Sequence, residues 1–231
     1  MSLPFKQLAK IVLRPILRSW PDEGRRIVQG PVLSQMLAEV AGHRAKIRRV
    51  LNAGAGEGGY TSLLLSLPDV ECVVESDIHR RTHFEVRDPR LRQIVSSLTD
   101  IPLADESIDL ILCTEVLEHI LDDRRALDEI RRTLSPNGWL LITVPTPPAV
   151  LDSAHVREGY RSEDLTSLLS ERSLEVLSVR FCMHFFFRFV LRMWPRLAWN
   201  PRIIVVGLSY LDRILPLGPP MDLLILARRV R

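Results

Sequence analysis

The amino-acid sequence predicts a single-domain α/β protein with a mostly parallel sheet of seven strands and helices on its faces. From Arg48 onward, short apolar runs alternate with segments of helical periodicity, which is the pattern of βαβ units. The run Ile108–Thr114 is apolar almost throughout, as expected for a strand that is buried on both faces. A chain of 231 residues, 46% hydrophobic and 26% charged, is large enough to bury such a core.

The predicted elements follow one another in a regular order. A glycine loop follows the first strand and leads into a helix that ends near Leu67, and further helices are expected over Asp122–Leu134 and from Ser162. Ser162 is predicted to be the N-cap of the last helix, with Glu163 and Asp164 in its first turn. The predicted strands are Arg49–Ala53, Glu71–Ser76, Leu91–Val95, Ile108–Thr114, Trp139–Val144, Leu174–Phe181 and Leu223–Ala227.

The basic residues are unevenly distributed along the chain. The net charge is only +3, but residues 1–21 and 178–211 contain several lysines and arginines and no acid. The basic excess therefore lies in two apolar flanks of a balanced core. The expected segments are a basic amphipathic preface at 1–40, the α/β core at 41–181, an apolar and basic insertion at 182–220, and the final strand of the core at 221–231.

Composition also excludes several classes of protein. The small net charge argues against a dedicated nucleic-acid binder. Cys72, Cys113 and Cys182 have no paired spacing, so neither disulfides nor a zinc site are expected, and a reducing compartment is favoured. There is no apolar run of the roughly 18–20 residues that cross a bilayer, and no signal-peptide pattern. The expected location is the cytoplasm, with a peripheral position at the inner membrane face as the alternative.

The segment Val50–Gly59 is the most informative part of the sequence. An apolar strand runs there into closely spaced glycines, so the backbone can approach a ligand without a Cβ in the way. Gly54, Gly56 and Gly59 satisfy the G-x-G-x-x-G pattern of dinucleotide binders. Asp77 ends the second strand about 20 residues later, where an acid faces the ribose of a bound nucleotide. These features fit NAD and S-adenosylmethionine equally well.

A second series of residues separates these two ligands. Ile101-Pro102-Leu103 is followed by Asp105-Glu106-Ser107-Ile108-Asp109, then by Glu115-Val116-Leu117-Glu118-His119, and finally by Leu134-Ser135-Pro136-Asn137-Gly138. In this series the chain resembles the class I S-adenosylmethionine-dependent methyltransferases, and within them the type 11-like group. The resemblance covers about Val50 to Pro145 and continues less closely through His155–Phe181.

The resemblance implies a Rossmann-like fold with an antiparallel last strand, and S-adenosylmethionine as the methyl donor. It implies that Asp77 binds the ribose, that Ile78 packs on the adenine, and that Glu115 lies near the amino acid end of the donor. Ser97 and Leu98 stand where the family has an acidic and then an apolar residue at the adenine edge. The residues implied at the methionine portion are Asn52, Gly54, Gly56 and Gly58, with the backbone around them.

Two of these positions depart from the family pattern. Asn52 replaces the acid that usually precedes the glycines, and asparagine can hydrogen-bond but lacks the charge that attracts an ammonium group. Ser97 replaces the usual aspartate at the adenine edge. We expect both changes to affect the affinity for the cofactor more than its identity.

Two histidines are candidates for the acceptor side of the reaction. Methyl transfer needs in-line alignment above all, and a base helps when the acceptor is a hydroxyl. His155 follows the fifth strand, where this fold usually places acceptor-side residues, and His119 follows the fourth. The alternative is that His155 braces its loop and that His119 supports the turn.

The letters Glu115-Val116-Leu117-Glu118-His119 also look like an E-x-x-E-H metal site of some methyltransferases that act on quinone precursors or RNA ends. Carboxylates and an imidazole can bind Mg²⁺ or a similar ion. The same letters occur in relatives without a metal, so no metal is expected, and the question stays open for Glu115, Glu118 and His119. His79 and His83 have helical spacing but lie in an arginine-rich turn, and are not expected to be ligands.

The two basic flanks share one pattern, in which cations recur every fourth residue among apolar and aromatic side chains. Such segments either pack on the sheet and roof the active site, or lie at an anionic membrane or a lipid-like acceptor. Pro15 and Pro195 limit the length of any helix there. The cations that would face a membrane are Lys6, Lys10, Arg14, Arg188, Arg192 and Arg196.

The sequence therefore predicts an S-adenosylmethionine-dependent methyltransferase that acts on a small or lipid-like acceptor, at oxygen, without a nucleic-acid partner. One alternative is an NAD-linked oxidoreductase, which the glycine pattern supports and the series from Pro102 to Gly138 opposes. The other is a catalytically inactive, membrane-surface binding module, which Asn52, Ser97 and the flanks support.

Overall fold

The computed structural model describes residues 21–43, 45–80, 86–149, 154–193 and 202–230. The chain divides into two compact units. The larger is formed by Val32–Phe181 with Asp222–Arg231, and the smaller by Met1–Pro31 with Cys182–Met221. The boundary at Pro31 lies inside the long helix α2, Pro21–Gly42.

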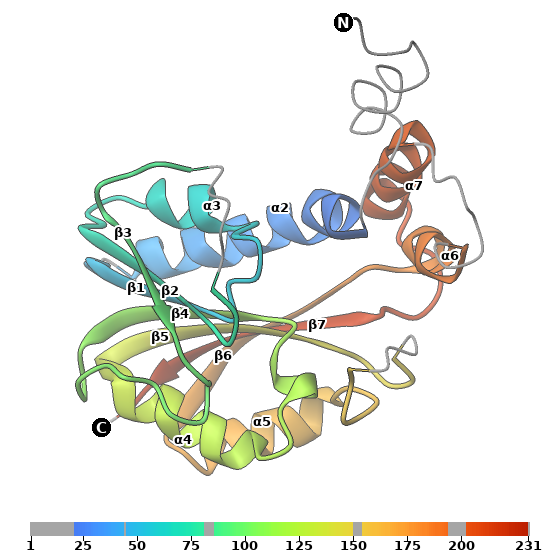
Figure 1. Ribbon diagram of the computed structural model, residues 1–231. Helices are drawn as coiled ribbons and strands as arrows, with labels where there is room; N and C mark the ends of the chain where they lie inside the picture. Colours follow the sequence, from blue (N-terminus) through green and yellow to red (C-terminus); the bar gives the residue numbers. More distant parts are fainter. Residues whose placement is uncertain (1–20, 44, 81–85, 150–153, 194–201, 231) are drawn as a thin grey trace, which may run out of the picture. The chain divides into compact units, whose positions relative to one another are not determined.

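The larger unit is built on a seven-stranded sheet with the order β3-β2-β1-β4-β5-β7-β6 (Figure 1). Pairing is parallel from β3 to β5, and β7 is antiparallel to β5. The predicted fold class is therefore confirmed, including the antiparallel last strand. The strands are β1 Arg49–Ala53, β2 Cys72–Asp77, β3 Leu91–Val95, β4 Ile108–Thr114, β5 Leu134–Pro145, β6 Leu174–Cys182 and β7 Asp222–Arg229.

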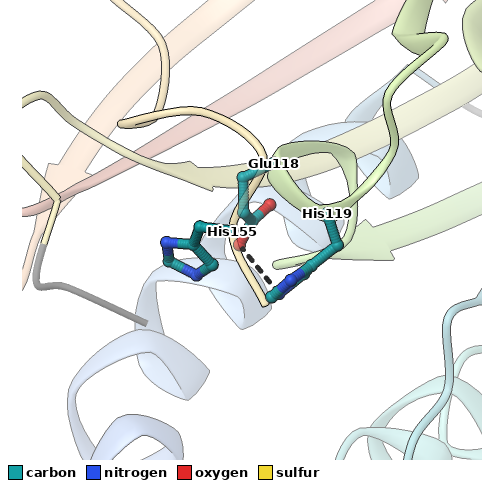
Figure 2. A group of neighbouring side chains, drawn as sticks. All are labelled: Glu118, His119 and His155. Atoms are coloured by element: carbon teal, nitrogen blue, oxygen red, sulfur yellow. Dashed lines mark ion pairs between the residues drawn. The ribbon is translucent and has the colours of Figure 1, made fainter. Parts of the chain in front are cut away.

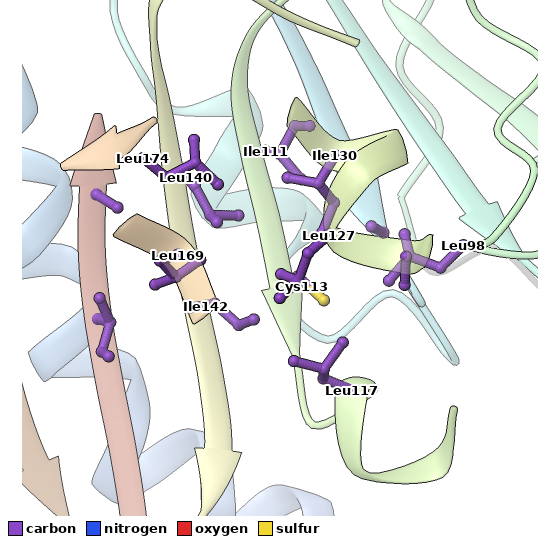
Figure 3. Packing of buried hydrophobic residues seen from close by; sticks show 14 of the residues in the cluster. Leu98, Ile111, Cys113, Leu117, Leu127, Ile130, Leu140, Ile142, Leu169 and Leu174 are labelled. Carbon is purple, nitrogen blue, oxygen red and sulfur yellow. The ribbon is translucent and has the colours of Figure 1, made fainter. Parts of the chain in front are cut away.

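Helices cover both faces of this sheet. Figure 1 shows α4 (Asp123–Thr133) and α5 (Ser162–Ser170) on one face, and α3 (Thr61–Leu65) with the second half of α2 on the other. The central strands are consequently buried on both sides. The hydrophobic residues under α4 and α5 form one cluster, which includes Leu98 before β4 and Leu174 at the start of β6 (Figure 3). A short 3-10 helix, η1 (Leu117–His119), follows β4.

The strand order places the ends of three strands together. The chain order reverses between β1 and β4, because β1 pairs with β2 on one side and with β4 on the other. Ligands of open α/β sheets bind in the crevice outside the carboxyl ends of the strands at such a reversal. The loops after Ala53, Asp77 and Thr114 all leave the sheet at this edge.

Most boundaries of the predicted elements lie within about two residues of the prediction, and two findings differ more clearly. Ser162 is not the N-cap of α5, because Arg161 occupies that position and no side chain caps the helix, although Glu163 and Asp164 lie in the first turn as predicted. The second difference is β5, which starts at Leu134 instead of Trp139, because the segment Ser135–Gly138 continues the strand instead of separating it from α4.

The smaller unit contains the helices α6 (Phe185–Met193) and α7 (Arg202–Ile214), which pack on one another. The buried carboxylate of Asp212 in α7 accepts hydrogen bonds from the backbone N–H groups of His184 and Phe187, at 2.7 and 2.9 Å, and so caps the start of α6. A Cβ on Gly24 would lie 2.8 Å from the Phe187 ring, so the start of α2 packs closely there. In the part of the chain that is described, no helix is both long and apolar enough to span a bilayer.

One ion-pair network holds the segment Ile101–Leu103, before β4, in place. The Arg132 guanidinium donates to the Glu129 carboxylate at 2.8 and 2.9 Å, and to the carbonyls of Ile101 and Leu103. The buried Glu129 carboxylate also accepts the N–H of Ile101, at 2.9 Å. The neighbouring guanidinium lowers the pKa of Glu129. These residues therefore fasten the loop before β4 to α4.

We expect Arg132→Met to lower the free energy of unfolding by about 2–4 kcal/mol, because it removes the partner of a buried carboxylate. Since the folded-state pKa of Glu129 is lowered, this stabilisation is complete above the ordinary glutamate pKa of about 4.3 and is lost as the pH falls below it. Urea unfolding at pH 7 and at acid pH measures both effects. Arg124→Met is the control: it removes only the exposed Arg124–Glu171 pair and should cost less than about 1 kcal/mol. Equal losses of unfolding free energy in Arg132→Met and Arg124→Met would contradict the stabilising role assigned to Arg132.

Candidate functional site

The glycine loop leaves β1 in a tight turn that is fastened to β2. The N–H groups of Gly54 and Ala55 both donate to the Ser76 carbonyl, at 2.7 and 3.0 Å. Gly54 has φ of 69°, and a Cβ there would lie 2.2 Å from the Val116 side chain. Only glycine fits between the two strand ends at this point.

Gly56 differs from Gly54, because it borders open space. Its φ is 50°, and a Cβ would meet no other atom within 4 Å. Its N–H donates to Asp77 Oδ2 at 2.8 Å, while the N–H of His79 donates to Oδ1 at 3.0 Å. Asp77 thus fixes the shape of the loop and retains lone pairs for another donor. The arrangement leaves room for a ligand beside a partly exposed carboxylate.

Asn52 lies in β1, directly before the loop, and is 2% exposed. Among the described residues, its Oδ1 has no hydrogen-bond partner. A buried acceptor without a donor is costly, so a ligand that brings a donor would compensate it. The free Oδ1 and the open space at Gly56 both fit the polar methionine end of S-adenosylmethionine.

The predicted adenine-side residues are placed in different ways. Ile78 is 65% exposed directly after β2, an apolar surface suited to an adenine ring. Ser97 is exposed, and its Oγ lies 2.7 Å from Thr99 Oγ1 and accepts the N–H of Thr99, so it shapes its own turn. Leu98 packs in the core and is 5% exposed, which leaves it little surface for a ligand (Figure 3).

Glu115 follows β4 with a positive φ of 54°. Its carboxylate accepts a hydrogen bond from Thr143 Oγ1 in β5 at 2.9 Å, and its N–H donates to the Thr143 carbonyl at 3.0 Å. The start of the loop after β4 is therefore tied to the neighbouring strand. Burial, together with the carboxylates of Glu118 and Glu115, raises the pKa of the Cys113 thiol, so this cysteine is not a nucleophile.

The structure brings the two candidate histidines together around a buried acid. Figure 2 shows His119 from η1, His155 from the loop after β5, and Glu118 between them. The two rings form an edge-to-face pair with centroids 4.7 Å apart, and His119 Nε2 lies 3.8 Å from Glu118 Oε1. The Glu118 side chain is 1% exposed, whereas that of His119 is 35% exposed. The cluster thus has a buried side and an accessible one.

An ionic clamp holds the loop that carries His155. Arg157 donates to the carbonyls of Ile120 and Leu121, at 2.8 and 3.0 Å, and pairs with Asp123. The Tyr160 hydroxyl donates to Asp123 Oδ2 at 2.7 Å. Burial, with the carboxylate of Asp123, raises the pKa of Tyr160, so its hydroxyl remains a donor. The N–H of Val156 also donates to the Glu118 carbonyl at 3.0 Å.

The sequence did not predict this clamp or the burial of Glu118. Arg157 and Tyr160 stand in a polar segment without periodicity, and their partner Asp123 lies in a predicted helix far away in the chain. The available signal was weak: an arginine and a tyrosine three residues apart beside the candidate His155.

Comparison with known proteins defines the class of the core. Residues 51–142 match the family model described as a methyltransferase domain. With the strand order and the glycine loop, this match supports a class I S-adenosylmethionine-dependent methyltransferase domain over residues 51–142, and S-adenosylmethionine as its methyl donor. The family and the cofactor predicted from the sequence are confirmed.

Curated relatives share this part of the chain. A "Probable S-adenosylmethionine-dependent methyltransferase" of Mycobacterium tuberculosis is 32% identical over 136 residues, which cover 54% of this chain and 48% of the relative. A demethylmenaquinone methyltransferase of Clavibacter sepedonicus is 35% identical over 74 residues, which cover 32% of this chain and 29% of the relative. The chain spans about half the length of the first curated relatives that it matches.

Solved structures share the fold over most of the chain. A SAM-dependent methyltransferase from Archaeoglobus fulgidus has a TM-score of 0.59 at 16% identity, and the match covers 97% of this chain and 100% of that one. The [4+2]-cyclase SpnF has a TM-score of 0.58 at 16% identity, covering 86% of this chain and 80% of that one. At such identities the likeness concerns the fold alone.

We expect Gly56→Val to abolish measurable binding of S-adenosylhomocysteine, because a branched side chain would fill the open space at the loop. Asp77→Ala should weaken this binding by about ten- to hundredfold, through loss of a charge-assisted hydrogen bond. Isothermal titration calorimetry measures both. Gly218→Val is a matched control, since Gly218 has φ of 78° and also borders open space, but lies outside the loop. If Gly56→Val and Asp77→Ala bind S-adenosylhomocysteine with the parental affinity, the assignment of the cofactor to this site is wrong.

Proposed function

We propose that this protein transfers a methyl group from S-adenosylmethionine to an oxygen of a small, lipid-like acceptor. The observation that carries the proposal is the pairing of two features of the same sheet edge. The glycine loop borders open space beside Asn52 and Asp77, whose side-chain oxygens can accept hydrogen bonds from a ligand. The loops after β4 and β5 supply two histidines and a carboxylate for the methyl acceptor.

The chain's own residues account for the steps that a methyltransferase must perform. S-adenosylmethionine supplies a methyl group on a sulfonium, whose C–S bond breaks as the bond to the acceptor forms. Asn52, Gly56 and Asp77 hold the donor, and Ile78 packs on its adenine. His155 accepts the proton of the acceptor hydroxyl, and the ring of His119 orients the His155 ring through their edge-to-face contact. His119 in turn faces the Glu118 carboxylate. The Arg157–Asp123 clamp keeps the His155 loop in position.

Two alternative functions have less support. Neither the matching family model nor the relatives named above is an NAD-linked oxidoreductase. An inactive binding module would not need a histidine pair beside a buried carboxylate. Because the neighbour SpnF is named a cyclase, the assay should follow the methyl group itself and not only the binding of the donor.

We expect His155→Ala to lower the rate of methyl transfer by about 10²–10⁴-fold, because a general base is lost, while the affinity for S-adenosylhomocysteine stays unchanged. The assay follows label from methyl-labelled S-adenosylmethionine into hydrophobic phenols, lipids and glycolipids, which are screened first. His43→Ala is the control, since His43 is an exposed histidine of the larger unit outside the cluster. If His155→Ala and His43→Ala both keep the parental rate, His155 has a structural role only.

The lipid-like character of the acceptor rests on the smaller unit. One side of α6 is buried through Phe187 and Val190, whereas Phe185 and Phe189 are 57% and 48% exposed. In α7, Ile203 is 82% exposed and Ile214 is 71% exposed. Exposed apolar side chains of this size favour a lipid surface. The name of the Clavibacter relative, which gives demethylmenaquinone as its substrate, points in the same direction.

Charge on the smaller unit complements an anionic bilayer. Arg192 is exposed in α6, and Arg188 nearby donates to the Pro219 carbonyl at 3.3 Å. The one acid of α7, Asp212, is buried at the start of α6, and Glu23 pairs with Arg202. The remaining predicted cations, Lys6, Lys10, Arg14 and Arg196, lie outside the described residues. We propose that this unit holds the enzyme at an anionic lipid surface.

We expect the double variant Arg188→Glu and Arg192→Glu to release the protein from anionic vesicles at low salt, because each cation near the surface contributes about 1 kcal/mol. Binding by the parent should also weaken as salt is added. Co-sedimentation with vesicles measures both effects. Arg87→Glu with Arg161→Glu, exposed arginines of the larger unit, gives the same charge change and should bind like the parent. A parent protein that stays in the supernatant at low salt would refute membrane attachment.

A further inference from the structure

The cluster of Glu118, His119 and His155 contains the donor set of a metal site. One ligand atom from each residue lies within 4.8 Å of the other two. Donors around a single zinc-like ion, each at about 2.0–2.2 Å, lie roughly 3–4 Å apart, so small side-chain rotations would bring these three onto one ion. Two imidazoles with one carboxylate are ligands that suit first-row transition metals, whereas Mg²⁺ and Ca²⁺ prefer oxygen donors throughout.

The orientation of His119 is a second, independent observation. Its Nδ1 lies 3.1 Å from the carbonyl oxygen of Ala154. A carbonyl oxygen can only accept, so Nδ1 carries the hydrogen and Nε2 is the nitrogen that faces the cluster. Metal-ligating histidines are held in this way, with the second ring nitrogen donating to a backbone carbonyl or a carboxylate.

The space between His119 and Glu118 is suited to a cation. His119 Nε2 faces the Glu118 carboxylate, and the distance of 3.8 Å from Nε2 to Oε1 is longer than a hydrogen bond, so the two atoms are far enough apart to share one ion. Glu118 is also 1% exposed, and a buried carboxylate is stabilised by a nearby cation.

We infer that Glu118, His119 and His155 bind a divalent transition-metal ion such as Zn²⁺ on the acceptor side of the active site. The ligand set differs from the E-x-x-E-H pattern in the sequence, because the Glu115 carboxylate accepts from Thr143 and stands outside the cluster, while His155 comes from the loop after β5. Three protein ligands leave a coordination position open, as in catalytic zinc sites. The role of the ion rests on the proposed function: it would bind and acidify the acceptor hydroxyl, whose proton would leave to water. In the metal-bound enzyme His155 would therefore act as a ligand, in place of the base described above.

The test is equilibrium dialysis of the untagged full-length protein against Zn²⁺, with the bound metal measured by atomic spectroscopy. We expect one Zn²⁺ per chain, held in the presence of millimolar Mg²⁺. Glu118→Gln, His119→Gln and His155→Gln should each raise the dissociation constant by about 100-fold or more. His43→Gln, which removes an exposed histidine elsewhere, should leave binding unchanged. Because Glu118 is buried, the two histidine variants and the melting temperature of each protein serve as checks on folding.

The inference is overturned if no Zn²⁺ is retained, if the folded histidine variants bind it like the parent, or if Mg²⁺ displaces it. Titration of the same samples with S-adenosylhomocysteine separates this inference from the proposed function. Binding of S-adenosylhomocysteine without Zn²⁺ would refute the metal site alone. Binding of Zn²⁺ without S-adenosylhomocysteine would refute the methyltransferase proposal and leave the metal site in place.

Discussion

The parallel pairing of β1 with both β2 and β4 is the constraint on which the rest of the structure depends. It places the loops after Ala53, Asp77 and Thr114 at one edge of the sheet, although they are far apart in the chain. Once these loops meet, Gly54 must pass against Val116 and the Gly56 N–H reaches the Asp77 carboxylate. The site is therefore a result of sheet topology, and the buried core under α4 and α5 makes that topology rigid.

Different parts of this edge are stabilised by different interactions. The glycine loop depends on backbone hydrogen bonds to Ser76 and on one carboxylate, Asp77, so it tolerates few side chains but needs little charge. The loop after β5 depends on an ionic clamp, in which Arg157 joins it to the residues that follow η1. Asn52 fits this division, because an uncharged acceptor before the glycine loop still offers a hydrogen bond.

The smaller unit follows another physical rule. Its helices bury one face against each other and fix their ends through the Asp212 carboxylate, which caps the start of α6. Their outer faces keep large apolar side chains with arginines between them, a composition that costs solubility unless a lipid or another surface is the partner. The proposed lipid-like methyl acceptor would explain why these apolar side chains are exposed.

The sequence by itself predicted the fold class and nearly all strand positions, because hydrophobic periodicity and glycine spacing are local properties of the chain. The order of its motifs carried the resemblance that implied the family and the methyl donor. It also named His119 and His155, but as separate candidates. Only the tertiary structure decided that they share a buried Glu118, that Glu115 instead binds Thr143, that Leu98 packs in the core, and that Arg132 and Arg157 are clamps. The physical reason is that burial and ion pairing depend on residues tens of positions apart, whose meeting is set by the sheet order and not by any pattern in their own neighbourhood.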